Sequence, residues 1–171
     1  VAGVLIPDEG TITVDGGVAP LIEITGGFVD DLTVRDNVVL TAGLHGMTRS
    51  EVDAAFDDII DFAEIGAFVD TPYKHLSSGM KVRIAFSVIS RLDEPIILVD
   101  EALAVGDKAF REKCYRRIEA MLEGGRTLFF VSHSEGDLRR FCTRGLYLDK
   151  GGLKLDADLT DVLDAYNSDY H

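Results

Sequence analysis

Apolar residues in this chain fall into two patterns, short continuous runs and longer runs at helical spacing. The clearest continuous run covers residues 96–99, follows Pro95, and ends in the adjacent carboxylates Asp100 and Glu101. A short apolar run next to a breaker indicates a strand that is buried on both faces of a parallel sheet. Other β-rich runs, which predict further strands, cover residues 11–14, 18–24 and 127–131.

Residues 33–92 have a different character, because their apolar positions recur at helical spacing. The pattern predicts one helix from about Thr33 toward Gly43. It predicts a second helix capped at Ser50, with Asp53 as the capping-box partner. The apolar face expected for this second helix comprises Val52, Phe56, Ile59 and Ala63.

Helices are also predicted on both sides of the strand at residues 96–99. One begins at Ser77 or Ser78, and another is capped by Asp107. A short helix, a hairpin near residues 145–155 and a last helix follow. The residues expected to face inward on these helices are Val82, Phe86, Ile89, Phe110, Cys114, Ile118, Met121, Leu138, Phe141, Val162, Leu163 and Tyr166. This order predicts an α/β protein whose mostly parallel sheet is interrupted by a helical insert.

Composition narrows the classes of function. The 171 residues carry 17 basic and 30 acidic side chains, a formal net charge of −13. This balance disfavours nucleic acid and anionic membrane surfaces as direct ligands, because both require basic patches. No apolar run approaches the ~18 residues that a membrane span needs. Cys114 and Cys142 lack metal-ligand spacing and lie among apolar residues, which is typical of core thiols in a reducing cytosol.

The chain begins at Val1 without a methionine. Its first ten residues have the pattern of the apolar end of a helix, a glycine cap and a Pro-Asp-Glu-Gly turn. We therefore expect that the chain has been cut on its amino-terminal side.

The carboxyl end of the 96–99 strand is a candidate for chemistry. Parallel sheets place functional groups just past the carboxyl ends of their strands. There Asp100 could hold Mg²⁺ through its water shell, and Glu101 could orient or deprotonate an attacking water. The alternative is a strand that ends in a solvated acidic turn.

The segment from Leu76 to Met80 is a candidate anion site at the start of a helix. Ser77 and Ser78 offer hydroxyls, Gly79 allows close approach, and the first backbone N–H groups of a helix are available to an anion. The alternative is an ordinary serine N-cap. Twenty residues separate Gly79 from Val99, enough for one helix, a loop and the acidic strand.

His133 follows the apolar strand at residues 127–131. In a parallel sheet this places it at the same edge as Asp100, where it could bind a phosphate oxygen and hold a water. A lone histidine is otherwise usually structural. The remaining histidines, His45, His75 and His171, have no such placement and are expected at the surface or in loops.

Together these motifs resemble the nucleotide-binding subunit of ABC transporters. Residues 76–80 resemble the L-S-G-G-Q signature, residues 96–100 Walker B, Glu101 the catalytic glutamate, residues 104–107 the D-loop and His133 the switch histidine. Within the family, Ser-Ser-Gly-Met and the Ala-Leu-Ala-Val-Gly-Asp segment look most like the ATPases that export O-antigen, capsule, teichoic acid or galactan. The Q-loop glutamine is replaced by Glu23, and the Walker A loop is expected before Val1.

The resemblance implies a partial RecA-like P-loop NTPase core with an inserted α-helical subdomain. Residues 1–32 would be the incomplete amino-terminal part of the core with the Q-loop, residues 33–92 the helical signature subdomain, and residues 93–171 the carboxy-terminal part of the core. Glu101 and His133 would be catalytic. The residues that would contact ATP or its Mg²⁺, or couple the sites, are Ser77, Ser78, Gly79, Asp100, Glu23 and Asp107, with Asp100 and Glu23 binding Mg²⁺ through water.

The resemblance also implies partners. Two subunits would close head to tail around two ATP molecules, with Ser77 and Gly79 reaching the partner's γ-phosphate and Asp107 coupling the sites. The gap between Glu23 and about Gly46, with Phe28 exposed, would receive a helix of a transmembrane permease. Such a subunit lies at the cytoplasmic face of the bacterial inner membrane and touches the membrane only through the permease. Without Walker A, residues 1–171 alone are expected to bind ATP weakly and to be inactive.

Two other functions remain open. One is a soluble ABC ATPase of DNA repair or translation, although the chain has neither a coiled-coil insert nor a second cassette. The other is a non-catalytic interaction module that has lost its phosphate loop. The presence of Asp100, Glu101, Ser77, Gly79 and His133 together argues against such a module.

Overall fold

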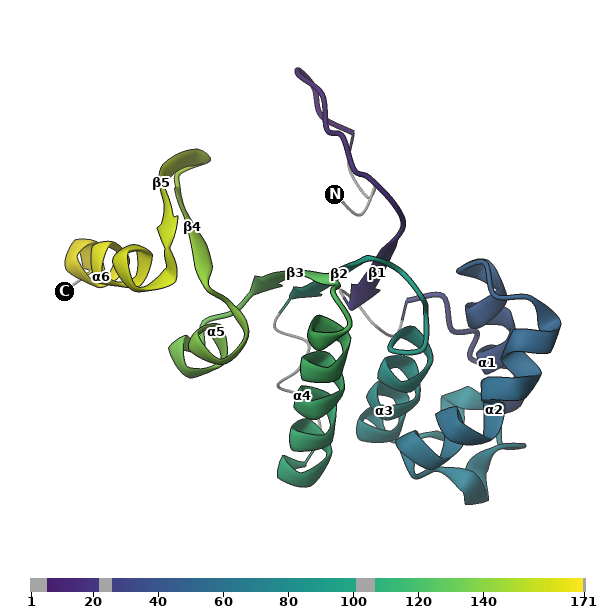
Figure 1. Ribbon diagram of the computed structural model, residues 1–171. Coiled ribbons are helices and arrows are strands. Elements are labelled where there is room, and N and C mark those ends of the chain that lie inside the picture. The colour runs from purple at the N-terminus through teal and green to yellow at the C-terminus, as the bar shows by residue number, and fades with distance from the viewer. Residues whose placement is uncertain (1–5, 22–25, 101–106, 171) are drawn as a thin grey trace. The chain divides into compact units, whose positions relative to one another are not determined.

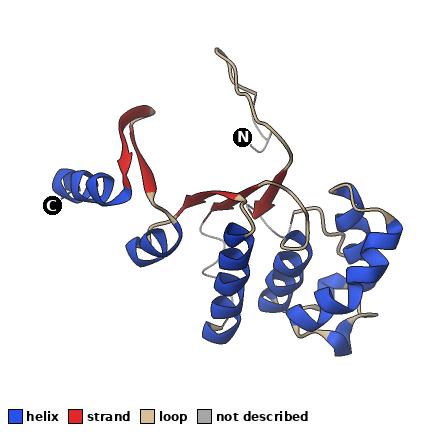
Figure 2. Cartoon of the chain, viewed as in Figure 1, coloured by secondary structure: helices blue, strands red, loops and turns tan. Residues whose placement is uncertain are grey.

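The computed structural model describes residues 6–21, 26–100 and 107–170. The chain forms two compact units, Val1–Phe129 and Phe130–His171. It contains both helices and strands (Figures 1 and 2). In chain order the elements are β1 (Val18–Leu21), α1 (Val34–Leu44), α2 (Arg49–Ala63), the 3₁₀ turns η1 (Gly66–Phe68) and η2 (Tyr73–His75), α3 (Ser78–Ile89), β2 (Ile96–Asp100), α4 (Lys108–Glu123), β3 (Thr127–Val131), α5 (Glu135–Phe141), β4 (Arg144–Asp149), β5 (Gly152–Asp158) and α6 (Leu159–Tyr170).

Strands β1 and β2 form a parallel pair whose carboxyl ends lie side by side. Their register aligns Val18 with Ile96 and Leu21 with Val99, and the sheet order is β1-β2-β3. The side chains of residues 97–99 in β2 are all buried. A buried inner strand in a parallel sheet was predicted from the continuous apolar run, and this prediction is confirmed.

Between residues 33 and 92 the described elements are the helices α1, α2 and α3 and the two 3₁₀ turns. Thr33 caps α1 by accepting a hydrogen bond from the Asp36 amide. One apolar cluster fills the space between α1, α2 and α3. Its buried members are Val34, Val38, Ala42, Val52, Ile59, Ile60, Ala63, Ile65, Val69, Tyr73, Leu76, Ile84 and Val88.

The cap of α2 differs from the sequence prediction. Thr48, not Ser50, is the N-cap, and Glu51, not Asp53, completes the capping box. The Glu51 carboxylate accepts from the Thr48 backbone amide at 2.7 Å. Asp53 instead pairs with Arg49 at 3.0 Å. Glutamate has one more methylene than aspartate, so the Glu51 side chain spans the distance back to the N-cap. The capping box therefore forms at Thr48-x-x-Glu51 and not at Ser50-x-x-Asp53.

Helix α3 is buried on more than one face. The prediction is confirmed for Phe86 and Ile89, which are buried, but Val82 is only half-buried. Ile84 belongs to the helical cluster, whereas the ring of Phe86 packs edge-on against Phe110 of α4 at 6.4 Å. Because α3 lies between two packed layers, a single stripe does not describe its buried surface.

One further strand prediction is wrong and another is confirmed. Residues 11–14 are not part of any described strand, and Ile12 is 56% exposed. An extended run becomes a sheet strand only when it pairs with an edge. The strand predicted at residues 127–131 is confirmed as β3, in which Phe129 and Val131 are 46% and 63% exposed. β3 occupies the end of the described sheet order, where one side has no neighbouring strand.

The second unit contains the predicted hairpin and the last helix. Lys150 and Gly151 both have positive φ at the turn between β4 and β5, the conformation that a tight right-twisted hairpin requires. Helix α6 packs on β4 where Gly145 leaves room. A Cβ atom at Gly145 would lie 2.9 Å from Cγ1 of Val162. The glycine therefore allows the close approach of helix and strand.

Candidate functional site

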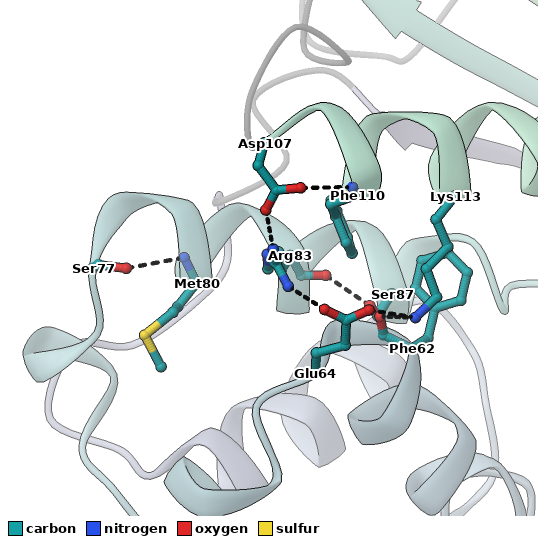
Figure 3. Close-up of polar contacts among 9 residues, drawn as sticks. All are labelled: Phe62, Glu64, Ser77, Met80, Arg83, Ser87, Asp107, Phe110 and Lys113. Carbon is teal, nitrogen blue, oxygen red and sulfur yellow. Dashed lines mark hydrogen bonds and ion pairs between the residues drawn. The ribbon is translucent and has the colours of Figure 1, made fainter.

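Ser77 lies at the amino-terminal tip of α3, as predicted. Its backbone is extended, with φ −65° and ψ 158°, and its Oγ accepts a hydrogen bond from the Met80 amide at 3.3 Å (Figure 3). Ser77 and Ser78 are both exposed. Capping uses only an acceptor lone pair of Ser77, so its hydroxyl hydrogen can still be donated to a ligand.

Gly79 is not required by the packing of its own chain. A Cβ atom placed there meets no atom of the described residues within 4 Å, and the φ of Gly79 is not in the left-handed region. Glycine in a helix costs about 0.5–1 kcal/mol relative to alanine. The space next to the Gly79 backbone is therefore available to an external group. Leu76, just before the tip, is buried and fixes the tip to the helical cluster.

The lysines near this tip are paired with a neighbouring loop. Lys74 contacts Asp31 at 2.7 Å, and Lys81 contacts Asp30 at 3.4 Å. Hydrogen bonding and charge attraction between Lys74 and Asp31 raise the pKa of the lysine and lower that of the carboxyl. Phe28, expected to be exposed in this loop, is half-buried because its ring stacks on Tyr73 at 4.9 Å.

Asp100 ends β2 and is exposed. A carboxylate oxygen suits Mg²⁺, which usually keeps several waters and takes only one or two protein carboxylates. Among the described residues no three His, Cys, Asp or Glu side chains form a metal cluster. A water-mediated site on Asp100 does not require such a cluster, and its role toward Mg²⁺ stays a prediction.

Asp107 is the N-cap of α4, as predicted. One carboxylate oxygen accepts from the Phe110 amide at 2.9 Å, and the other pairs with Arg83 of α3. The hydrogen bond from Phe110 is the main cause that lowers the pKa of Asp107, and Arg83 lowers it further. The structure thus brings Asp107 against the helix that carries Ser77.

The other predicted site residues are His133, Glu23, Glu101 and residues 104–106 of the D-loop. His133 is exposed, follows β3, and directly precedes Ser134, the N-cap of α5. It belongs to the second compact unit, so its predicted meeting with Asp100 stays a prediction. Glu23, Glu101 and residues 104–106 of the D-loop lie outside the described residues.

Three residues near the site were not predicted from the sequence. Arg83 contacts two carboxylates, Glu64 ends α2 in a left-handed conformation at φ 58°, and fully buried Asn37 holds a loop. A charged residue between Val82 and Ile84 is a signal that could have directed attention to Arg83. An asparagine on an apolar helix face is the corresponding signal for Asn37.

Comparison with known proteins identifies the family. No family model matches the chain. It is 40% identical over 166 residues to the O-antigen export system ATP-binding protein RfbB of Klebsiella pneumoniae, covering 97% of this chain and 68% of RfbB. It is 41% identical to ABC transporter protein AbcA of Aeromonas salmonicida, of which it covers 56%. It is 38% identical to the teichoic acids export ATP-binding protein TagH of Bacillus anthracis, of which it covers 30%.

Solved structures agree on the fold. An ATP-binding subunit of an ABC transporter matches with a TM-score of 0.76 at 19% identity, covering 88% of this chain and 62% of that one. A dimeric ATP-binding cassette bound to ADP and Pi matches with a TM-score of 0.66 at 24% identity, covering 83% and 62%. The fold is that of ABC ATPase domains, which confirms the predicted fold class. The chain belongs to the family of ABC transporter ATP-binding proteins, among those of O-antigen and teichoic acid export systems.

Proposed function

We propose that this protein hydrolyses ATP and thereby powers the export of a polysaccharide or polyol-phosphate polymer. The observation that carries the proposal is the tip of α3, where Ser77 is exposed and Gly79 faces space that none of the described residues fills. This is the position of the signature motif that the sequence predicts. The names of the relatives support the class of cargo.

Each of the proposed site residues has a separate role in ATP hydrolysis. Asp100 would hold Mg²⁺ through water, and the bound ion would neutralise charge on the phosphates. Glu101 orients the attacking water, and His133 donates a hydrogen bond to the γ-phosphate. Glu23 senses the γ-phosphate and the same ion. These roles follow from the resemblance and from the exposed position of Asp100 at the end of a parallel strand.

A second copy of the chain completes each site. The amino-terminal tip of α3 carries Ser77, Ser78 and Gly79. If this tip acted within its own subunit, that same subunit would have to hold the phosphate that the tip contacts. In the proposed dimer this tip binds the triphosphate held by the partner, and Asp107 couples the two sites. The dimeric form of a structural neighbour supports this arrangement.

Attachment to the membrane is proposed to occur through a permease. None of the helices in the described ranges is long and apolar enough to cross a bilayer. The export-system names of the relatives support a permease partner and a position at the cytoplasmic face of the inner membrane.

The test uses the full-length protein and steady-state ATP turnover. We expect Mg²⁺-dependent turnover that falls by at least about 100-fold in Glu101→Gln, because the attacking water loses its base. Glu123→Gln, at an exposed glutamate at the end of α4, is the matched control and retains turnover. Equal turnover by both variants would reject the proposed catalysis.

The cargo is tested in the cells that make the protein. Replacing the gene by the Glu101→Gln form is expected to remove the polymer from the cell surface and to leave it inside the cell. A normal amount of surface polymer in that strain would contradict the proposed role in export. It would not contradict the proposed ATPase activity.

A further inference from the structure

Arg83 of α3 joins three helices through a single guanidinium group. One of its nitrogens donates to Glu64 at the end of α2 at 2.7 Å, and another donates to Asp107 at the start of α4 (Figure 3). Its planar face also lies 4.7 Å from the centre of the Phe110 ring. The side chain is only 19% exposed. Partly buried pairs of this kind are screened less by salt than exposed ones.

The partner of Arg83 on α2 is itself fixed. Glu64 has left-handed backbone geometry, and its second oxygen accepts from Lys113 of α4 at 3.1 Å. Lys113 also donates to the carbonyl of Phe62 at 2.9 Å. Beneath these charges the rings of Phe62, Phe86 and Phe110 pack on one another. Arg83 is therefore held from two sides and over an aromatic layer.

Asp107 uses its two carboxylate oxygens for different purposes. One accepts the amide of Phe110 and caps α4, whereas the other meets Arg83. The cap alone restrains only one of the two carboxylate oxygens. The bond from Arg83 restrains the other, because a guanidinium presents its N–H groups in a rigid plane.

Ser77 and Arg83 share one rigid helix, six residues apart. At 1.5 Å per residue this separates them by about 9 Å along the axis. A movement of the tip therefore carries Arg83 with it, and Arg83 carries Asp107. No contact between Arg83 and a phosphate is needed for this effect.

We propose that Arg83 is a positioning residue for ATP hydrolysis, which holds Asp107 in register with the helix tip that bears Ser77. It transmits the engagement of that tip to the N-cap of α4. The inference rests on the proposed function, because it assigns a role in ATP turnover.

The test compares Arg83→Met with Arg126→Met in the full-length protein. Arg126 is a matched control, because its side chain is 22% exposed and pairs with Asp93 at 3.0 Å, away from the tip of α3. We expect Arg83→Met to lower kcat by about 10- to 100-fold with KM for ATP within about twofold, since misplacement affects the reacting state more than binding. Arg83→Lys is expected to restore part of kcat, and Arg126→Met to keep it.

A double variant identifies the residue through which Arg83 acts. Asp107→Asn retains an oxygen to cap α4 but loses the ion pair. Adding Arg83→Met to Asp107→Asn is expected to lower kcat no further, because residues that act as one unit are not additive. A multiplied loss, or a kcat for Arg83→Met equal to that of Arg126→Met, would overturn the proposal.

Amide hydrogen exchange separates this inference from the proposed function. Without ATP, the Phe110 amide is expected to exchange faster in Arg83→Met and at the normal rate in Arg126→Met. An unchanged Phe110 amide in Arg83→Met would overturn the positioning role whatever the turnover. Absence of turnover in the unmodified protein would instead refute the proposed function.

Discussion

Asn37 and Val29 bind each other through two hydrogen bonds that close a ring between a side chain and a loop backbone. The Val29 amide donates to Oδ1 of Asn37 at 2.6 Å, and Nδ2 of Asn37 donates to the Val29 carbonyl at 2.9 Å. The same Nδ2 also reaches the carbonyls of Leu32 and Thr33 at 3.2 and 3.0 Å. Asn37 is fully buried, so it holds the loop that precedes α1 against the helical cluster.

Replacing this asparagine is expected to be costly. Asn37→Leu should lower the free energy of unfolding by about 2–4 kcal/mol, because backbone groups of the loop lose their partners without gaining water. Urea denaturation of the full-length protein measures this change. The chain's other asparagine, half-buried Asn167 in α6, is the control, and Asn167→Leu should change stability by less than about 1 kcal/mol. Equal effects of the two substitutions would show that Asn37 does not fix the loop.

Two substitutions at the start of α2 distinguish the observed N-cap, Thr48, from the N-cap predicted from the sequence, Ser50. Thr48→Ala should destabilise by about 1 kcal/mol, because the Glu51 amide loses its acceptor at the N-cap. Ser50→Ala should be close to neutral, since Ser50 lies inside the helix. Thermal denaturation of both variants measures the difference. The reverse order of the two effects would restore Ser50 as the cap.

The buried phenol of Tyr73 is expected to make the folded protein less stable at alkaline pH. Burial, and secondarily the charge of Asp30, raise the pKa of its phenol to about 12 from the ordinary 10.0. The unfolded chain releases this proton from pH 10 upward while the folded chain keeps it. The contribution of Tyr73 is therefore fully present below pH 10 and is lost as the pH rises toward 12.

Tyr73→Phe removes this effect. In the described part of the chain the hydroxyl of Tyr73 has no hydrogen-bond partner, so the substitution should be nearly neutral at pH 7. Between about pH 9 and about pH 11.5 the unmodified protein should lose about 2 kcal/mol more than Tyr73→Phe. Tyr166→Phe, at an exposed tyrosine, should behave like the unmodified protein. Identical alkaline profiles for Tyr73→Phe and the unmodified protein would contradict a buried phenol.

Local patterns were predicted well from the sequence. The caps at Ser77 and Asp107 were found because an N-cap depends on the residue itself and its next few neighbours. The buried strand β2 was found because its apolar run is continuous. The error at α2 arose because two capping patterns, at Thr48 and Ser50, overlap by two residues.

Contacts between distant residues were not predicted. Arg83 meets Glu64 and Asp107 across 19 and 24 residues, and no period in the sequence encodes such a meeting. The exposure of Phe129 in β3 depends on which strand or helix lies beside it, which composition does not reveal. For the same reason His133 was assigned to the site by its place after a strand, and not by a contact.

The most direct measurement of the central claim is complementation between two inactive forms of the full-length protein. Asp100→Asn removes the carboxylate at the end of β2, and Gly79→Asp blocks the tip of α3. If each site joins the strand end of one copy to the helix tip of another, a mixed dimer has one site in which both parts are intact. We predict that either form alone fails in single-turnover ATP hydrolysis and that mixing the two restores it. Failure of the mixture to hydrolyse ATP, although mixed dimers form, would contradict a site shared between two copies.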